Sequence, residues 1–397
     1  MISLQKLCAL CIFLVSATAL AQDTPKPAAP APDPIKSVLP KTPALIPLTV
    51  NSDDTVTFRY RDKYAQNVAI NIEGQPHNFP MTMDDTGLWS VTSPALPAEI
   101  YGYNFVVDGN RLVDTHNIDV RRNFLGNSSN FLIPATPAAP WELTDIPHGR
   151  IDQHIFTTKI EKNYTADQVP YDVYLPPNYD AKRKGGYPVL YLLHGYSDPE
   201  YAWINVGRAN LMLDSMIAEG KAVPMIVVLP LGYGNLNFVT HGESGWNSPT
   251  TVDENTSLFS QSLLTEIMPT VEHEYNTAKG RQNRAITGLS MGGLESLTIG
   301  LNHPDLFAYV GGFSAGGFHA DKFDEAFPGL DPAKANLKLL WIACGSSDGL
   351  LKTNTALIAW LKTKDFDVTP IQTPGAHNWI VWRDNLLHFA PLLFQPK

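Results

Sequence analysis

Cysteine is scarce in this sequence. Three cysteines occur in 397 residues, and two of them, Cys8 and Cys11, lie close to the N-terminus. So few cysteines exclude a disulfide scaffold and a cysteine-rich zinc module. We expect Cys8 and Cys11 to leave with an export signal, so that Cys344 stands alone and no intrachain disulfide forms.

Positive charge and long hydrophobic runs are also in short supply. Lys and Arg number 29 against 39 Asp and Glu, which gives a net charge of −10. An acidic chain repels phosphate backbones, and this argues against a general nucleic-acid binder. After the N-terminal segment, no stretch is long and apolar enough to predict a membrane anchor. The 44% of hydrophobic residues is still enough to bury sizeable cores, which excludes wholesale disorder.

The first 21 residues have the pattern of a cleavable export signal. Lys6 is the only charge before Asp23, and the apolar core from Leu7 to Val15 is too short to remain as a membrane anchor. Ala19 to Ala21 then form an A-x-A cleavage site. We therefore expect a signal peptide over residues 1–21 and a protein that is secreted or periplasmic.

A small β module is predicted between two linkers. Residues 22–47 are rich in proline and alanine, a composition typical of an extended, solvated linker. Residues 48–133 contain short alternating runs separated by turn signals, including the hairpin dipeptide at 108–109. This pattern predicts a small all-β, immunoglobulin-like sandwich, and residues 134–143 form a second linker.

The same module resembles the early-set modules that are grouped with glycogen-binding carbohydrate modules. The resemblance rests on Gly87-x-Trp89 and on the run from Tyr101 to Gly109. It implies that an exposed Trp or Tyr could stack on a sugar ring. The alternative is that Trp89 and Tyr103 belong to the core of the sandwich, in which case they bind nothing.

Residues 144–397 alternate strands with helices, as expected of one large α/β domain. Continuous apolar runs predict strands that are covered on both faces, so we expect a doubly covered, mostly parallel sheet with right-handed crossovers. The expected strands are 188–193, 225–229, 284–289, 337–344 and 368–372, and the expected helices include 291–301, 353–362 and 383–393.

The sharpest chemical signal is the pentapeptide from Gly288 to Gly292, a G-x-S-x-G motif centred on Ser290. It lies where a predicted strand becomes a predicted helix, which is the context of a nucleophile elbow. Glycines two residues on either side of the serine remove Cβ atoms that would clash in such a turn. The motif therefore predicts that Ser290 is a nucleophile.

A serine nucleophile needs a histidine base, and the usual chain order of this sheet is serine, acid, histidine. His377 lies in a loop directly after a predicted strand, where it could reach the serine. His319 is a weaker rival. The histidines downstream of Ser290 are His303, His319, His377 and His388.

For the acid, Asp348 follows the end of another predicted strand and precedes His377 by enough residues for one helix and one strand. Asp365 and Asp367 follow that helix and therefore belong to the opposite end of the sheet. The alternative for Asp348 is a structural role as a helix cap.

An oxyanion hole is expected from two backbone N–H groups. Met291 follows the nucleophile and supplies one of them. Tyr196 supplies the other, because Gly195 permits an unusual turn in the loop after an early strand. His194 could brace that loop or could simply be a packed histidine.

Four spaced motifs carry a family resemblance: His194-Gly195, the segment 285–293, Cys344-Gly345-x-x-Asp348 and the segment 375–383. Over residues 150–395 the chain resembles the esterase D group of α/β-hydrolases, and within it family-one carbohydrate esterases, the feruloyl and acetylxylan esterases. Enterobactin-type siderophore esterases share both parts of the chain. The resemblance implies no metal and no other cofactor.

Carried onto this sequence, the resemblance gives Ser290, Asp348 and His377 the roles of a catalytic triad, with Tyr196 and Met291 as oxyanion donors. It implies a serine esterase that releases ferulate from plant cell-wall arabinoxylan. Feruloylated or acetylated plant polysaccharide would then be the partner.

The alternatives are an acetylxylan esterase, a siderophore esterase, an acyltransferase and a non-catalytic carbohydrate-binding protein. Three tryptophans near the motifs could contact the acyl group, although core packing is at least as good an interpretation. These are Trp203, Trp246 and Trp379.

Overall fold

The computed structural model describes residues 45–396, which belong to one compact unit. The predicted signal peptide and residues 22–44 of the first linker lie outside the described residues. Within the described part, no helix is both long enough and apolar enough to cross a bilayer.

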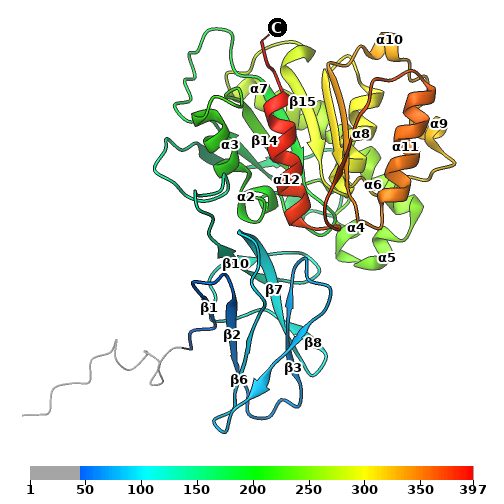
Figure 1. Cartoon of the computed structure of the whole chain (residues 1–397). Helices are drawn as coiled ribbons and strands as arrows, with labels where there is room; N and C mark the ends of the chain where they lie inside the picture. The colour runs from blue at the N-terminus through cyan, green and yellow to red at the C-terminus, as the bar shows by residue number, and fades with distance from the viewer. Residues whose placement is uncertain (1–44, 397) are drawn as a thin grey trace, which may run out of the picture. The chain divides into compact units, whose positions relative to one another are not determined.

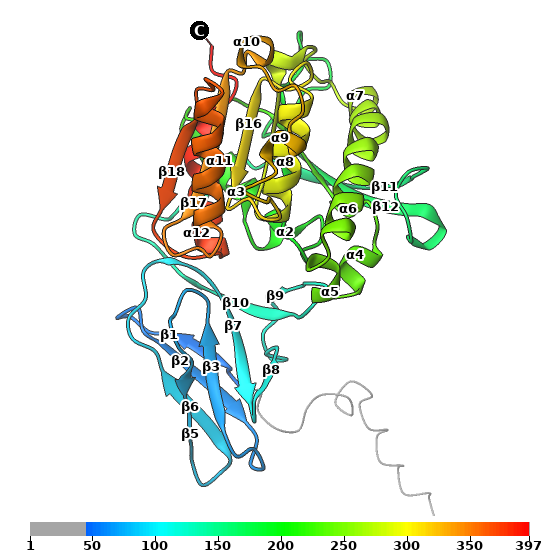
Figure 2. The ribbon, with the colours of Figure 1, turned by 90° about the vertical axis from the view of Figure 1, so that its right-hand side faces the viewer.

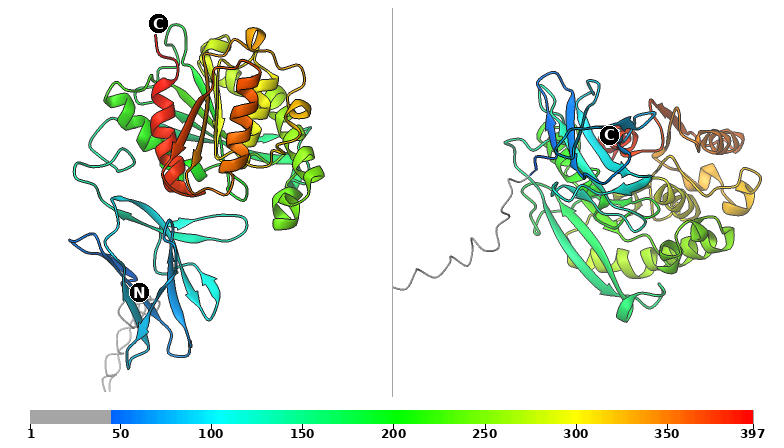
Figure 3. Two further views of the ribbon diagram at one scale, coloured as in Figure 1. Left: turned by 45° about the vertical axis from the view of Figure 1, so that its right-hand side comes forward. Right: turned by 90° about the horizontal axis from the view of Figure 1, so that it is seen from below.

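The β module contains two antiparallel sheets, drawn in blue to cyan in Figure 3. One sheet has the order β1-β2-β6-β5, and the other has the order β4-β3-β7-β10-β9 with β8 paired to β7. All of these strands lie within the predicted 48–133 module; an immunoglobulin-like topology stays a prediction. The bounds are β1 Leu48–Val50, β2 Val56–Arg61, β3 Val68–Ile72, β4 Phe79–Pro80, β5 Thr82–Met83, β6 Leu88–Thr92, β7 Glu99–Val107, β8 Asn110–Leu112, β9 Val120–Arg121 and β10 Ser128–Ile133.

The two aromatic residues that could have stacked on a sugar are core residues of this module. Trp89 is 8% exposed and donates its indole N–H to the Asp62 carbonyl at 2.6 Å. Tyr103 is 1% exposed and donates its hydroxyl to Asp114 Oδ2 at 2.7 Å. The prediction that either ring stacks on a sugar is therefore wrong, because both rings are buried and the polar group of each already makes a hydrogen bond within the module.

The larger region has one eight-stranded sheet in the order β11-β12-β14-β13-β15-β16-β17-β18. All pairs from β14 to β18 along this order are parallel, whereas β12 pairs antiparallel with β11 and with β14. The sheet is thus mixed, with the expected parallel core. The bounds are β11 Arg150–Thr157, β12 Gln168–Leu175, β13 Val189–Leu193, β14 Ile226–Pro230, β15 Arg284–Gly288, β16 Tyr309–Phe313, β17 Leu339–Gly345 and β18 Thr369–Thr373.

Helices cover both faces of this sheet, as expected. One apolar cluster joins the strands to α6, α7, α8 and α11, and a second joins them to α2, α3 and α12. In Figure 1, α3 and α12 lie on the near side of β14 and β15, and Figure 2 shows α8 and α11 beside β16 and β17. The bounds are α2 Ala202–Asn205, α3 Ala209–Ala218, α4 Asn237–Thr240, α5 Glu243–Trp246, α6 Pro249–Ser262, α7 Met268–Glu274, α8 Met291–Asn302, α9 Phe323–Ala326, α10 Pro332–Ala335, α11 Leu351–Thr363 and α12 Trp379–Phe389.

The parallel strands bring the chemically interesting loops to one edge of the sheet. Each loop follows the carboxyl end of a strand: Tyr196 follows β13, Ser290 follows β15, Asp348 follows β17 and His377 follows β18. Carboxyl ends of parallel strands share one edge, and open α/β sheets place their sites there.

Candidate active site

Ser290 sits in a sharp turn between β15 and α8. Its backbone has φ 52° and ψ −111°, a region that side-chain-bearing residues rarely adopt. The Ser290 N–H donates to the Phe313 carbonyl at 2.8 Å, and its carbonyl accepts from the Gly316 N–H at 3.0 Å. These two bonds hold the strained residue between neighbouring strand ends.

The glycines of the motif are required by close backbone packing. A Cβ on Gly288 would lie 2.5 Å from the Gly292 carbonyl oxygen. A Cβ on Gly292 would lie 2.5 Å from the His194 carbonyl oxygen. Both distances are shorter than any real Cβ contact, so the elbow and the loop after β13 pack as closely as they do only because both positions lack side chains.

A hydrogen-bonded chain joins the three predicted triad residues. His377 Nε2 lies 3.0 Å from Ser290 Oγ, and His377 Nδ1 lies 2.9 Å from Asp348 Oδ2. The serine hydroxyl is within range to donate to Nε2, while Nδ1–H is within range to donate to the carboxylate. This geometry can remove a proton from the serine and stabilise the resulting imidazolium.

Asp348 is held as a carboxylate although its side chain is fully buried. Burial alone would raise its pKa, but hydrogen bonds from His377 and from the Leu350 N–H together bring the pKa below its ordinary value. A buried carboxylate is therefore available to orient the imidazole at neutral pH.

The rival histidines have other surroundings. His388 Nδ1 faces the Asp384 carbonyl at 2.8 Å on the last helix, and His319 lines a groove beside α6. Among the described residues, only His377 is hydrogen-bonded to the Ser290 side chain.

The two predicted oxyanion donors lie on either side of Ser290. Met291 is the first residue of α8, and Tyr196 follows Gly195, whose Cβ position would lie 3.5 Å from Ser290 Cβ. Within residues 45–396, neither the Tyr196 N–H nor the Met291 N–H has a hydrogen-bond acceptor. Both N–H groups are thus free to stabilise negative charge beside Ser290.

His194 braces the loop that carries Tyr196. It is fully buried, its Nδ1 lies 2.8 Å from the Gly195 carbonyl, and its Nε2 accepts from the Gly232 N–H at 2.8 Å. Burial lowers its pKa to about 4, so it stays neutral with the proton on Nδ1. The neutral ring ties the loop after β13 to the loop after β14.

Two of the three tryptophans proposed to contact substrate do not reach it. Trp203 and Trp379 are 0% exposed, and their rings pack against each other with centroids 5.1 Å apart. Trp203 also donates its indole N–H to the Leu193 carbonyl at 2.9 Å. The expectation was wrong for both, because they fill the core between the sheet and the helices α2 and α12.

Trp246 lies differently, beside the loop that holds Ser290. Its ring would approach a Cβ on Gly316 to 3.2 Å, and Gly316 is the residue whose N–H bonds to Ser290. Tyr196 packs on the same ring with centroids 5.2 Å apart. Trp246 therefore remains a candidate for substrate contact.

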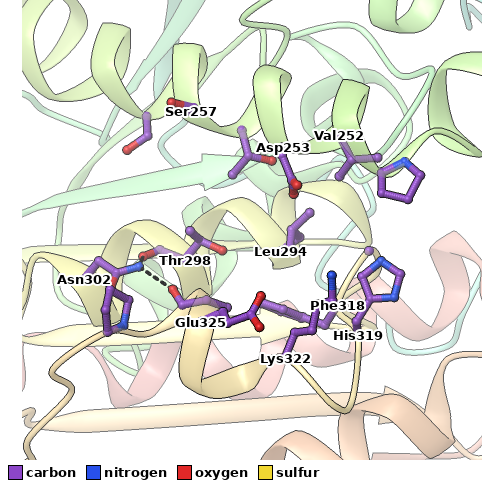
Figure 4. Close-up of a pocket in the computed structure, with 16 residues that line it drawn as sticks. Val252, Asp253, Ser257, Leu294, Thr298, Asn302, Phe318, His319, Lys322 and Glu325 are labelled. Carbon is purple, nitrogen blue, oxygen red and sulfur yellow. Dashed lines mark hydrogen bonds between the residues drawn. The ribbon is translucent and has the colours of Figure 1, made fainter.

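A groove of about 700 Å³ runs between α6 and α8 and does not include the triad residues. Figure 4 shows Val252 and Asp253 of α6 facing Leu294 of α8 across it. A smaller hollow shares Val252 and Asp253 with this groove and is also lined by Trp246. The groove thus continues to Trp246, and Ser290 lines neither hollow.

Sequence reasoning missed that the β module touches the site. Glu73 Oε1 accepts from the Trp379 N–H at 3.0 Å, two residues after His377. The Phe124 N–H donates to the Ser197 carbonyl at 2.8 Å, one residue after Tyr196. No local motif indicated these contacts, because Glu73 and Phe124 lie between strands of the module and are far along the chain from the residues that they meet.

A buried ion pair fixes the same module to α12. Arg383 is 0% exposed, and its Nε lies 3.0 Å from Glu99 Oε1. Its other nitrogens donate to the Val206 and Ile100 carbonyls at 3.0 and 2.6 Å. Each nitrogen of this buried guanidinium thus donates one hydrogen bond, and these bonds join α12 to β7 of the module and to the end of α2.

Comparison with known proteins agrees with this geometry. The model of the esterase family, described as "Putative esterase", matches residues 163–391. An endo-1,4-beta-xylanase/feruloyl esterase of Xylanibacter ruminicola is 32% identical over 359 residues, which cover 87% of this chain and 46% of that protein. The chain therefore spans about half the length of this relative.

Two groups of solved structures share the fold. A ferulic acid esterase of Anaeromyces mucronatus aligns with a TM-score of 0.55 and 24% identity, over 64% of this chain and 93% of that one. The enterobactin esterase of Shigella flexneri aligns with a TM-score of 0.65 and 18% identity, over 88% of this chain and 96% of that one. At such identities these similarities establish the α/β-hydrolase fold alone.

The matched family segment contains the whole hydrogen-bonded chain of Ser290, His377 and Asp348. More than half of the sequence falls within that segment. The chain therefore belongs to the esterase family and has the α/β-hydrolase fold.

Proposed function

We propose that this chain is a secreted serine esterase that releases ferulate, or a related hydroxycinnamate, from plant cell-wall arabinoxylan. The observation that carries the serine mechanism is the chain of hydrogen bonds from Ser290 Oγ through His377 to Asp348. The choice of ferulate is supported by the relative at 32% identity, whose name includes feruloyl esterase.

The first half of the reaction forms an acyl-enzyme. Ser290 Oγ attacks the ester carbonyl carbon while its proton passes to His377 Nε2, and the carbonyl electron pair moves to oxygen. The tetrahedral oxyanion lies against the N–H groups of Tyr196 and Met291. The C–O bond to the alcohol then breaks, and His377 returns the proton to the departing oxygen.

The second half restores the serine. Water attacks the acyl carbon and gives its proton to His377 Nε2, a second oxyanion forms, and the bond to Ser290 breaks. The proton returns to Ser290 Oγ and the free acid leaves. Throughout, Asp348 fixes the proton of the resting imidazole on Nδ1 and stabilises the imidazolium.

Trp246 gives an aromatic acyl group a place to lie. Its ring is partly exposed next to Gly316, and Tyr196 and Phe238 pack beside it. A feruloyl ring stacked there would have its ester carbonyl near Ser290. The groove in Figure 4 would take any part of the acyl group that extends further.

The test is a comparison of rates on three classes of ester. We expect the purified protein to hydrolyse methyl ferulate and feruloylated arabinoxylan with a higher kcat/KM than acetylated xylan or an enterobactin-like trilactone. The Ser290→Ala protein is the negative control, and we expect it to hydrolyse none of these esters. A higher kcat/KM on acetylated xylan or on the trilactone would contradict ferulate as the acyl group and would indicate an acetylxylan esterase or a siderophore esterase. Transfer of the acyl group to an added sugar acceptor, detected by product analysis, would indicate an acyltransferase.

The proposal includes export from the cell. Export rests on residues 1–21 alone, with their short apolar core and the A-x-A site. N-terminal sequencing of the protein recovered from its native host tests it directly. A mature chain that begins at Gln22 is expected, and a chain that retains Met1 would contradict export by cleavage.

A further inference from the structure

The strand β11 forms one edge of the eight-stranded sheet. It stands first in the strand order and pairs only with β12. In Figure 2, both strands lie at the right-hand end of the sheet. Outside the ladder with β12, no backbone group within residues 45–396 is hydrogen-bonded to Ile151, Gln153 or Ile155. Unpaired N–H and C=O groups along a sheet edge can pair with a further strand.

The backbone N–H and C=O groups of Ile155 point away from β12. Ile155 lies opposite Pro170, which has no N–H to exchange with it. The Pro170 carbonyl accepts from the Leu231 N–H at 3.4 Å, so Pro170 directs its backbone toward β14. Because alternate residues of an antiparallel strand bond to the same neighbour, Ile151, Gln153 and Ile155 all direct their backbone groups to the free edge.

The strand β11 lacks the features that usually protect an edge strand from pairing. It has eight residues, contains neither proline nor lysine, and includes Ile155, whose side chain is 69% exposed. The opposite edge strand, β18, has five residues and contains Pro370. Short edge strands, prolines and lysines are the means by which natural proteins prevent edge-to-edge pairing. Of the two edges, β11 is therefore the one that is open to a partner.

The side chains of β11 are complementary to those of a second, antiparallel copy of β11. Two registers pair seven residues of the strand with the same strand of another copy, one with the two-fold axis at Gln153 and one with the axis at His154. With the axis at Gln153, Asp152 lies opposite His154 of the partner subunit. In the same register, Ile151 lies opposite the partner's Ile155.

The register with its axis at Gln153 is favoured by these pairs. A carboxylate opposite an imidazole and an isoleucine opposite an isoleucine both stabilise a pair of strands. The other register would place two imidazoles opposite each other and would set the exposed Ile155 against a glutamine. With the axis at Gln153, the residues that direct their backbone groups to the free edge also lie opposite one another, so each such pair exchanges two N–H···O=C bonds.

We infer that two copies of this chain associate through antiparallel pairing of their β11 strands, with Gln153 on the two-fold axis. The two eight-stranded sheets then form one continuous sheet. Because the two-fold contact occupies the β11 edge of both copies, association stops at a dimer. The dimer does not depend on the acyl group that the enzyme releases, since three strands separate β11 from β15 in the sheet.

The mass of the protein in solution is the first test. Size-exclusion chromatography with light scattering should give twice the mass of one chain for the wild-type protein. Gln153→Lys should halve that mass, because two like charges would face each other on the axis. Gln372→Lys is the matched control, the same substitution of an exposed glutamine on the opposite edge strand, and should remain a dimer at the same protein concentration.

A cysteine on the axis tests the register and does not depend on how a charged variant folds. Residues of a hydrogen-bonded antiparallel pair have Cα atoms about 5.5 Å apart, which is within the range that a disulfide can bridge. Under mild oxidation, Gln153→Cys should therefore run as a covalent dimer in a non-reducing SDS gel, and dithiothreitol should return it to the monomer. Thr157→Cys is the control, an exposed residue of the same strand whose two copies lie far from the axis and should not cross-link.

The wild-type protein, which carries only the native cysteines, is the blank for the cross-linking experiment. A monomeric mass for the wild-type protein would overturn the inference. So would a dimer whose mass Gln153→Lys leaves unchanged, or a Gln153→Cys protein that cross-links no more than Thr157→Cys.

Discussion

Glu73 and Trp379 are hydrogen-bonded partners although 306 residues separate them in the chain. The Glu73 carboxylate accepts from the first N–H of α12 at 3.0 Å. A carboxylate at a helix N-terminus is favourable because it meets unpaired N–H groups and the positive end of the helix dipole. Since His377 lies two residues before Trp379, we propose that Glu73 positions His377 through this contact.

Glu73→Gln should lower kcat while leaving KM for methyl ferulate nearly unchanged. The amide keeps the size of the side chain but weakens the charged contact that orients the loop, and a small misplacement of a base costs on the order of tenfold or more in rate. Steady-state kinetics with active-site titration measures the effect per folded active site. Asp85→Asn is the matched control, an exposed acidic residue of the module that touches nothing in the site.

A purely structural role for Glu73 predicts a different result. In that case, the number of titratable active sites and the thermal stability would fall, and kcat per titrated site would stay at the wild-type value. That outcome would remove Glu73 from the positioning of His377.

The sharp turn at Ser290 could be predicted from the sequence because the residues that indicate it are close together in the chain. The G-x-S-x-G pattern and the strand-to-helix context around Ser290 lie within a few residues, and steric constraints on a sharp turn allow few alternatives. His377 and Asp348 followed from chain order and from the rule that parallel strands end at one edge. Together these arguments predicted the three side chains that the structure joins by hydrogen bonds.

Elements that depend on contacts between distant segments of the chain could not be predicted from local sequence patterns. β16 contains Gly311 and Gly312, which resemble a break in a strand, yet a Cβ on Gly311 would lie 2.7 Å from Thr287 Oγ1. Glycine is thus required there by a neighbouring strand. Likewise Trp203 and Trp379 lie near the motifs in sequence, but the core that buries them is assembled from distant segments.

Two substitutions of Ser290 separate catalysis from backbone strain. Ser290→Ala should abolish ester hydrolysis, with kcat lower by several orders of magnitude, as is typical for loss of a serine nucleophile. It should barely change stability, because alanine keeps the cost of the positive φ. Retention of most of the turnover would contradict the role of Ser290 as the nucleophile.

Ser290→Gly should abolish hydrolysis as well but should raise the free energy of unfolding. Glycine adopts a φ of 52° without a Cβ clash, so relief of strain is worth about 1 kcal/mol, partly offset by the greater freedom of the unfolded chain. Urea unfolding of the two variants side by side measures the difference. Equal stabilities would show that the elbow stores no strain at this position.

Asp348→Asn tests the orientation of the base. The amide oxygen can still accept from the Leu350 N–H, so the loop after β17 keeps its anchor. The amide NH₂ would then face His377 Nδ1 and favour the tautomer that carries its proton on Nε2, which cannot accept from Ser290. We expect kcat on methyl ferulate to fall by on the order of 10⁴ with little change in thermal stability. A loss of less than tenfold would assign the acid role to another carboxylate.

His194 should make the protein sensitive to acid. Its pKa is about 4 in the folded protein, because the ring is buried, and about 6.5 in the unfolded chain. Between these values the unfolded chain binds more protons, so the free energy of unfolding falls as the pH is lowered from 6.5 toward 4. The expected loss from this residue is on the order of 3 kcal/mol at pH 4 relative to pH 7.

His194→Gln isolates that contribution, because glutamine can accept from the Gly232 N–H but does not titrate in this range. Asp198, whose pKa is raised to about 6 by burial, has the opposite dependence, since the stability it contributes falls as the pH rises from 3.8 to 6. Both proteins carry Asp198, so its effect cancels in the difference between them. Urea unfolding at pH 7, 5.5 and 4.5 should show the advantage of the wild-type protein over the variant shrinking as the pH falls. An advantage that stays constant across this range would mean that the His194 ring is not held neutral by its burial, and that the brace between the loops after β13 and β14 survives protonation.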